Sequence, residues 1–425
     1  VSNLHTPGGT TIRNCQLNNV SFDNIISDDS CDFLIRNTKL EGVNFTNCHS
    51  LKPADPQGKD FEHSVMIVSY GTNFNNCYFI NCSSNRHSGA ICVAGEPGNT
   101  ANITNCVFDN CTSGVGGAVY LHGTGLSANR HSNIINCTFK NCEATEWGGA
   151  LGSSQDYLNV ENCKFINNTA KQGAAFMVGG ITHGLDGDNS QGHYNTMKNS
   201  YFFNNTGTEE GGAVHITGHH NSAIDCTFDD NFAEKGKGAA IYVEGDYASI
   251  DGSIFTRHQS ESGTVYIEGD HFTCNNSELK NNTASHGGAG IYVEGDYSYI
   301  DNSVFINNNA SRHGGAIHTT GDNAKIYNSE FRENNAIPSA TDSDYGLGGA
   351  IFINGKNNDI SYSKFKYNTA RNGSAIYNRG DDLKLTDDLF ENNQAWSYFL
   401  FTEAKPPEAY WSEDMEFAVN VTLVA

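Results

Sequence analysis

The sequence predicts an all-β protein, a single parallel β-helix of about 14 coils with three short strands in each coil and capping segments at its ends. Three observations predict this fold. A phenylalanine recurs at near-constant spacing, and small and polar residues recur at fixed offsets from it. In addition, no long stretch has the 3.6-residue apolar spacing of a helix, and the abundant Asn, Gly and Thr are poor helix residues.

The phenylalanine marks the repeat. The commonest interval is 26 residues, as between Phe139 and Phe165 and between Phe305 and Phe331. Periods of roughly 20–50 residues are typical of solenoids, whereas a propeller blade needs roughly 40 residues or more. The interval is therefore too short for a propeller. The repeat positions are Phe22, Phe45, Phe79, Phe108, Phe139, Phe165, Phe202, Phe228, Phe255, Phe305, Phe331, Phe365 and Phe390, with Leu279 in the one vacancy.

Other residues keep a fixed distance from this phenylalanine. Three residues after it stands Asn, as in Asn308, or Cys in the early repeats, as in Cys111. Two residues before it stands Cys or Ser, preceded by a run that is mostly Asn, and five residues after it stands a small residue, mostly Ala. In a coil of short strands equivalent residues stack, so Phe is expected inside and Asn at the bends. There the Asn amides would form hydrogen bonds along the column.

A second block follows the phenylalanine by about ten residues. It reads Gly-Gly-Ala followed by an aliphatic residue at 116–119, 148–151, 211–214, 314–317 and 348–351. Gly-Gly provides the backbone freedom that a tight corner needs. The alternating residues that follow, such as 241–244, are expected to form the next strand.

The charge balance excludes some function classes. Lys and Arg total 25 and Asp and Glu total 48, which gives a net charge of −23. Nucleic-acid binding needs concentrated positive charge, so no nucleic-acid partner is expected. No run approaches the ~18 apolar residues of a membrane-spanning helix, so no membrane span is expected in this sequence.

Two domains are expected from the change in composition near the end. Residues 1–395 carry the β-helix repeats. Residues 396–425 contain two of the three tryptophans, Trp396 and Trp411, and two adjacent prolines. We expect this segment to be a cap or a linker strand toward a missing region, because the open end of a β-helix would otherwise expose strand edges.

The repeat also resembles known families. The motif is complete in Phe165-Ile-Asn-Asn-Thr-Ala and Phe305-Ile-Asn-Asn-Asn-Ala, and it is paired with Gly-Gly-Ala-Ile. It resembles the repeats of chlamydial polymorphic membrane proteins and, still more, those of adhesin-like surface proteins of methanogenic archaea, over roughly residues 20–395. The resemblance implies a right-handed β-helix, an extracellular location at the cell surface, tethering by regions outside this sequence, and a role in attachment. It brings no catalytic residues with it.

An aromatic column is the first candidate site. Three coils repeat Tyr-x-Glu-Gly-Asp, and the alternation of strand residues sends Val243, Ile267 and Val293 inward. The aromatic residues should then face outward, where they could stack on sugar rings. The alternative is that aromatic residues simply favour strand surfaces. The expected ligand-binding residues are Tyr242, Tyr266, Tyr292, His318, Phe352 and Tyr377.

Carboxylates in the same coils form a second candidate site. Like charges about 5 Å apart repel by roughly 0.8 kcal/mol in water, and Ca²⁺ is a natural counterion for a row of carboxylates. The alternative is a solvated acidic face with Gly-Asp serving as a turn. The expected metal ligands are Glu244, Asp246, Glu268, Asp270, Glu294 and Asp296.

The inserted loops and the cysteines give further hypotheses. The loop at 179–196 contains Asp186, Asp188 and Ser190, which are oxygen ligands of the kind that bind calcium. Most of the 13 cysteines occupy the two stacked columns, and we interpret them as small buried thiols and not as a disulfide framework. Asn-x-Ser/Thr sequences such as those at Asn136 and Asn309 would be glycosylation sites in a secreted glycoprotein.

The function expected from these features is adhesion. The chain would bind a glycan or a protein on another cell, through an exposed face and loops of the β-helix. One alternative is a carbohydrate-active enzyme, either a polysaccharide lyase or a glycoside hydrolase. Stacked carboxylates about 5 Å apart occur in any such column, however, so this spacing does not indicate catalysis. The other alternative is a passive structural stalk.

Overall fold

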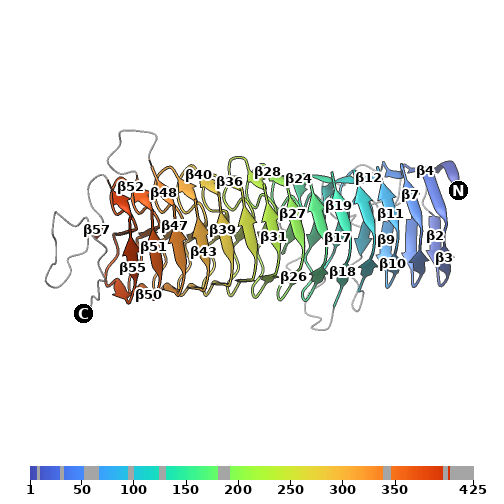
Figure 1. Cartoon of the computed structure of the whole chain (residues 1–425). Helices are drawn as coiled ribbons and strands as arrows, with labels where there is room; N and C mark the ends of the chain where they lie inside the picture. The colour runs from blue at the N-terminus through green and yellow to red at the C-terminus, as the bar shows by residue number, and fades with distance from the viewer. Residues whose placement is uncertain are drawn as a thin grey trace. The chain divides into compact units, whose positions relative to one another are not determined.

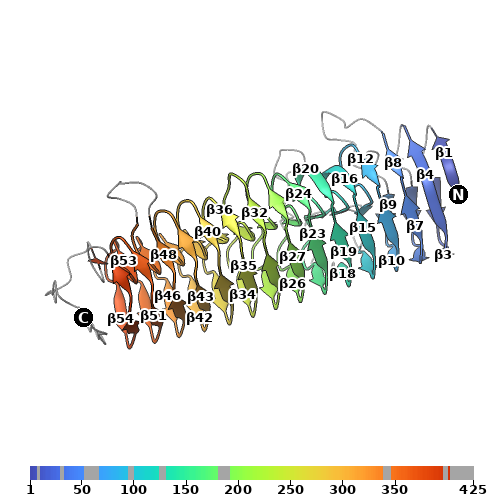
Figure 2. The same ribbon diagram turned by 45° about the horizontal axis from the view of Figure 1, so that its top comes forward.

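The computed structural model describes residues 1–6, 10–28, 33–51, 67–93, 100–123, 131–179, 192–337, 346–395 and 401–402. The chain divides into two compact units, Val1–Ser222 and Ala223–Ala425. Figure 1 labels the strands along the chain. Each unit is a parallel β-helix whose strands lie on three faces, which we call A, B and C. A coil passes from a face B strand to a face C strand and then to face A (Figure 2).

Faces B and C have one strand in each coil. In the first unit face B consists of β2 (Thr10–Arg13), β5 (Phe33–Arg36), β9 (Ile67–Tyr70), β13 (Ile91–Val93), β17 (Val119–Leu121), β21 (Leu151–Ser153), β25 (Phe176–Val178) and β29 (Val214–Ile216). In the second unit it consists of β33 (Ile241–Val243), β37 (Val265–Ile267), β41 (Ile291–Val293), β45 (Ile317–Thr319), β49 (Ile351–Ile353), β53 (Ile376–Asn378) and β57 (Phe401–Thr402).

Face C follows the same plan. In the first unit it consists of β3 (Gln16–Asn18), β6 (Lys39–Glu41), β10 (Asn73–Asn75), β14 (Asn102–Thr104), β18 (Asn133–Ile135), β22 (Asn159–Glu161) and β26 (Thr196–Lys198), and β30 (Ser222–Ile224) lies at the division between the units. In the second unit it consists of β34 (Ser249–Asp251), β38 (Thr273–Asn275), β42 (Tyr299–Asp301), β46 (Lys325–Tyr327), β50 (Asp359–Ser361) and β54 (Lys384–Thr386).

Face A has two strands in most coils, because a bend divides it. In the first unit these are β1 (Ser2–Thr6), β4 (Ser21–Ser27), β7 (Asn44–Thr46), β8 (His49–Ser50), β11 (Tyr78–Ile80), β12 (Ser83–Ser84), β15 (Val107–Asp109), β16 (Thr112–Val115), β19 (Thr138–Lys140), β20 (Glu143–Trp147), β23 (Lys164–Ile166), β24 (Thr169–Ala170), β27 (Tyr201–Phe203) and β28 (Thr206–Gly207).

The second unit repeats the arrangement. Its face A strands are β31 (Thr227–Asp229), β32 (Phe232–Ala233), β35 (Ile254–Thr256), β36 (Gln259–Ser260), β39 (Glu278–Lys280), β40 (Thr283–Ala284), β43 (Val304–Ile306), β44 (Asn309–Ala310), β47 (Glu330–Arg332), β48 (Asn335–Ala336), β51 (Lys364–Lys366), β52 (Thr369–Ala370), β55 (Leu389–Glu391) and β56 (Gln394–Ala395).

The predicted fold class is confirmed. Over the described residues of both units face C has 14 strands, one for each coil, and the strands pair in parallel and in register. The described residues contain no α-helix, and so none that could cross a membrane. The expected cap or linker at 396–425 lies outside the described residues, apart from β57, so the domain boundary at 395 stays a prediction.

The phenylalanine column forms the core, as predicted. In the first unit, Phe79 and Phe108 have ring centroids 4.8 Å apart, with an interplanar angle of 5°. In the second unit, Phe305 and Phe331 stack at 4.9 Å. Leu279 pairs with the neighbouring phenylalanines in the same register and is fully buried. The core is therefore a continuous apolar column within each unit.

Two kinds of Asn column hold the bends. Asn276 and Asn302, three residues before the phenylalanine position, have φ values of 51° and 46°, and the Nδ2 of Asn302 donates to Oδ1 of Asn276 at 2.8 Å. Asn adopts this left-handed conformation more readily than most residues. A second left-handed column lies two residues after the phenylalanine position, at Asn281 and Asn307. The predicted Asn bends are confirmed.

The Asn column three residues after the phenylalanine lies inside the coil. Asn308 is fully buried, and its Nδ2 donates to Oδ1 of Asn334 at 3.0 Å and to the carbonyl of Leu279 at 2.8 Å. The same Oδ1 of Asn334 accepts the backbone N–H of Asn308 at 3.0 Å. Each amide thus satisfies backbone groups that the bend would otherwise leave buried without a partner.

Candidate functional site

The predicted aromatic column is assembled, but it is not exposed. Tyr266 and Tyr292 stack with centroids 4.7 Å apart, and Phe352 and Tyr377 at 5.8 Å. Tyr242 is only 4% exposed and Tyr266 only 2%. Of the six residues Tyr242, Tyr266, Tyr292, His318, Phe352 and Tyr377, all except Tyr292 are buried. The expectation that these rings lie open to a ligand is therefore wrong.

Residues that directly precede the corner glycines cover these rings. Lys237 Nζ lies 4.4 Å from the centroid of the Tyr266 ring, and the His313 ring lies 4.6 Å from that of Phe352. Leu347 packs with Phe352 and Tyr377 in a buried cluster. The side chains of face B do point away from the core, as predicted, but this neighbouring segment lies over them. A ligand-binding role for this column stays an untested prediction, and it would require the covering residues to move.

Burial also sets the protonation of this column. It raises the pKa of Tyr292 to about 12, with the Glu294 carboxylate acting in the same direction. It lowers the pKa of His318 to about 3, assisted by the nearby His313 and Arg379. Both side chains are therefore neutral at neutral pH, which suits a packed column.

The predicted metal ligands have partners within the protein. Tyr242 Oη donates to Glu268 at 2.5 Å, and Tyr266 Oη donates to Glu294. The Oδ1 atoms of Asp246 and Asp270 each accept a backbone N–H of the next coil, at 2.9 and 2.8 Å. These bonds offset the repulsion that suggested Ca²⁺.

No group of three or more His, Cys, Asp or Glu in the described residues is placed to hold a metal ion. Calcium binding by Glu244, Asp246, Glu268, Asp270, Glu294 and Asp296 stays an untested prediction. The possible calcium ligands Asp186, Asp188 and Ser190 lie outside the described residues.

An exposed aromatic column lies instead at the corner between faces B and C. In the first unit Tyr194 stacks on Tyr157 at 5.0 Å and on His220 at 4.7 Å. In the second unit His271 stacks on Tyr247 at 4.5 Å and on Tyr297 at 5.0 Å. In the second unit the sequence could have revealed this column, because each of its three rings directly follows Gly-Asp. Within the column, neighbouring rings cover one another's faces.

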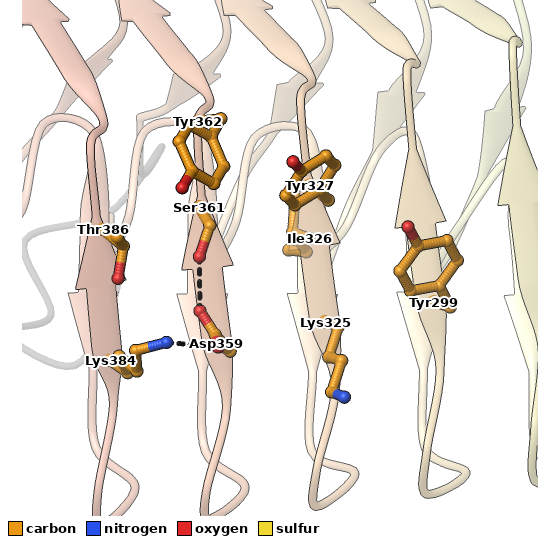
Figure 3. Close-up of a pocket in the computed structure, with 9 residues that line it drawn as sticks. All are labelled: Tyr299, Lys325, Ile326, Tyr327, Asp359, Ser361, Tyr362, Lys384 and Thr386. Atoms are coloured by element: carbon orange, nitrogen blue, oxygen red, sulfur yellow. Dashed lines mark hydrogen bonds and ion pairs between the residues drawn. The ribbon is translucent and has the colours of Figure 1, made fainter.

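Open ring faces occur at a shallow depression on face C of the second unit, which we call the tyrosine depression (Figure 3). Its volume is about 240 Å³. Tyr327 and Tyr362 are 40% and 48% exposed, and their rings meet edge to face at 65°, with centroids 5.1 Å apart. Tyr299 makes no ring contact in the described part of the chain. The lining residues are Tyr299, Lys325, Ile326, Tyr327, Asp359, Ser361, Tyr362, Lys384 and Thr386.

Local structure positions these side chains. Tyr299 and Tyr327 are outward residues of β42 and β46, whose inward residues Ile300 and Ile326 are buried. Tyr362 occupies the left-handed bend with φ 55°, where Asn302 and Asn328 stand in the preceding coils. A left-handed conformation costs a non-glycine residue about 1 kcal/mol, and Tyr lacks the short polar side chain that favours Asn there.

Polar groups complete the tyrosine depression. Lys384 Nζ lies 3.0 Å from Asp359 Oδ2, and Ser361 Oγ donates to Asp359 Oδ1 at 2.6 Å. Although partial burial acts to raise it, these two bonds and the charges of Lys384 and Lys325 hold the pKa of Asp359 below its ordinary value. The lining includes one carboxylate, whereas glycoside hydrolysis uses two. Open aromatic faces beside hydrogen-bonding groups suit binding of a sugar.

A second depression lies over face A of the second unit and has a volume of about 300 Å³. His286 Nδ1 lies 2.8 Å from Glu261 Oε1 there. Burial and the charge of Arg312 lower the pKa of His286, although Glu261 acts in the opposite direction. Apart from His286, the lining has one aromatic residue, Phe232. This depression therefore has fewer aromatic rings on which a sugar could stack than the tyrosine depression has.

One comparison with known proteins supports the fold. Residues 212–404 match a family model described as right handed beta helix region. No curated protein matches the chain. A solved structure, titled as a mannuronic acid specific polysaccharide family 6 lyase from human gut microbiota, aligns with 14% identity over 85% of this chain and 76% of that one, with a TM-score of 0.39. At that identity and score the likeness carries no argument about activity. The fold is a right-handed parallel β-helix.

Proposed function

We propose that this protein is an adhesin-like recognition protein of the cell surface that binds carbohydrate at the tyrosine depression. The observation that supports this best is the open ring faces of Tyr299, Tyr327 and Tyr362 on three neighbouring coils of a rigid face (Figure 3). Aromatic faces are apolar platforms that match the C–H faces of sugar rings, and the adjacent Lys, Asp and Ser groups match sugar hydroxyls.

The rigidity of the site supports binding further. Tyr327 and Ser361 are register partners in the β46–β50 pairing, and the inward residues of these strands are buried. The backbone of the site therefore needs little ordering when a ligand binds, which reduces the entropic cost of association. The extracellular location rests on the resemblance of the repeat to surface adhesins and belongs to the same proposal.

Retention on an immobilised panel of polysaccharides and glycans, with and without Ca²⁺, tests the proposal. The variants Tyr327→Ser and Tyr362→Asn remove the two exposed rings, and Asn is the residue that the bend carries in preceding coils. We expect each variant to reduce retention about fivefold or more, and Tyr362→Asn to keep or increase thermal stability. Tyr297→Ala, which removes a 54% exposed ring from the corner column, is the matched control and should bind normally.

Two results would contradict the proposal. Equal loss of retention in the control would show that the tyrosine depression has no special role. Oligosaccharides released into the supernatant, detected by mass spectrometry, would indicate a carbohydrate-active enzyme instead. Calcium dependence of retention would at the same time test the predicted acidic metal ligands.

A further inference from the structure

The tyrosine depression differs in charge from the protein as a whole. Its lining has two ammonium groups, on Lys325 and Lys384, and one carboxylate, on Asp359, whereas the chain has a net charge of −23. The register places Lys325 between Tyr299 and Asp359 in one outward column, followed by Lys384. At the same column position the two preceding strands carry Ser249 and Thr273. The ammonium groups thus begin where the open tyrosines begin.

The two lysines are not equivalent. Lys384 forms the ion pair with Asp359, and Ser361 also binds that carboxylate. Lys325 forms no ion pair with any described residue, and its side chain extends from β46 between Tyr299 and Asp359 (Figure 3). Its charge nevertheless helps to hold the pKa of Asp359 low.

Asp301, a further carboxylate on β42, does not pair with Lys325. Asp301, the register partner of Tyr327, interacts with Tyr299. Together with burial, it raises the pKa of Tyr299. Lys325 therefore remains an unpaired cation beside open aromatic faces, and the carboxylate of Asp359 is already matched by Lys384.

We propose that the tyrosine depression takes an acidic saccharide, a sugar that carries a carboxylate such as a hexuronic acid. The sugar ring would lie against Tyr299 or Tyr327, and its carboxylate would pair with the ammonium group of Lys325. This inference rests on the proposed carbohydrate binding and adds the substrate class. An exposed ion pair contributes modestly and is screened by salt. The acidic sugar should therefore bind about five- to tenfold more tightly than its neutral counterpart at low ionic strength, and the difference should shrink at higher salt.

Calorimetric titration with a matched pair of probes tests this. The probes are a galacturonic acid oligosaccharide and its carboxyl-reduced, neutral galactose form, so they differ only in the carboxylate. Lys325→Gln should remove the preference, and Lys325→Arg should keep it. Lys364→Gln takes the same charge from the exposed first position of β51 on face A and serves as the matched control. Circular dichroism would check that each variant is folded.

Each outcome decides between the claims. Loss of the preference in Lys325→Gln alone supports the inference. Equal binding of both probes by the unmodified protein, or an unchanged preference in Lys325→Gln, overturns the inference and leaves carbohydrate binding intact. Binding of neither probe, together with no retention on the glycan panel, overturns the proposed function itself.

Discussion

The early and the late coils build the same interior columns from different residues. In the early coils the position three residues after the phenylalanine holds Cys82, Cys111 and Cys142, and from Asn168 onward it holds mostly amides, such as Asn308 and Asn334. Two residues before the phenylalanine, the early coils carry mostly Cys and the late coils mostly Ser. All these side chains are buried, so the columns accept a thiol, a hydroxyl or an amide.

The hydrogen bonds show what the difference means. The Cys111 thiol lies 3.6 Å from the Phe79 carbonyl, a weak interaction, and burial raises its pKa. Asn308 by contrast bonds to the amide of the next coil and to a backbone carbonyl, and also accepts from the preceding coil. No disulfide bond joins the described cysteines. The amide therefore adds hydrogen bonds along the column that a thiol cannot make.

The largest expected effect is loss of the amide column. Asn308→Ala should lower the free energy of unfolding by about 3 kcal/mol, because it leaves several buried backbone and amide groups without partners. Cys111→Ala should cost about 1 kcal/mol, since it removes mainly buried volume. Urea unfolding, with hydrogen exchange of the neighbouring coils, measures both. Asn308→Cys should fall between them, and equal costs for the two alanine variants would contradict the comparison.

His258 sharpens the comparison, because it replaces Asn in the second unit's column. Its Nδ1 accepts the Asn231 backbone N–H at 3.0 Å, and its Nε2 lies 3.2 Å from the Phe228 carbonyl, so the neutral ring imitates the amide. Burial lowers its pKa to about 4. The unfolded ring binds protons more readily, so the stability it provides is present above about pH 6.5 and is lost as the pH falls toward 4.

We expect an acid-induced loss of about 2 kcal/mol in the free energy of unfolding between pH 7 and pH 4 that depends on His258. His258→Asn should abolish this part of the pH dependence while preserving the column. His271→Asn, at the exposed corner column, is the control. Thermal unfolding at a series of pH values measures the difference, and the same slope in both variants would contradict the assignment.

The smallest expected effect concerns the last coil. Asp388 stands where preceding coils have Ser, is 1% exposed, and accepts the Ser363 backbone N–H at 2.8 Å. Burial raises its pKa to about 7 despite that bond. The stability of this coil is therefore greatest below about pH 4 and is lost as the pH rises through 7. Asp388→Ser should increase it by about 1 kcal/mol at pH 8, measured by hydrogen exchange of 384–395, with no gain at pH 4.

The sequence alone was sufficient for the repeat, the number of coils and the Phe and Asn columns. These follow from local rules, since every coil places equivalent residues in register and each column has the same neighbours above and below. It also placed Tyr266 correctly on the side of the strand that points away from the core. The spacing of the repeat could not reveal that the side chain of Lys237, from the preceding coil, lies over the Tyr266 ring.

Only the tertiary structure decided which aromatic rings are open. Tyr247 is exposed and His271 half-buried, and their rings stack on each other, whereas Tyr327 and Tyr362 meet edge to face at 65°. The tyrosine depression combines non-repeating residues from neighbouring coils, which are far apart in sequence and adjacent only because of the strand register. A repeat determines what stacks, because stacking is periodic. Exposure depends on what the intervening chain covers and on ring orientation, and both are set by packing in three dimensions.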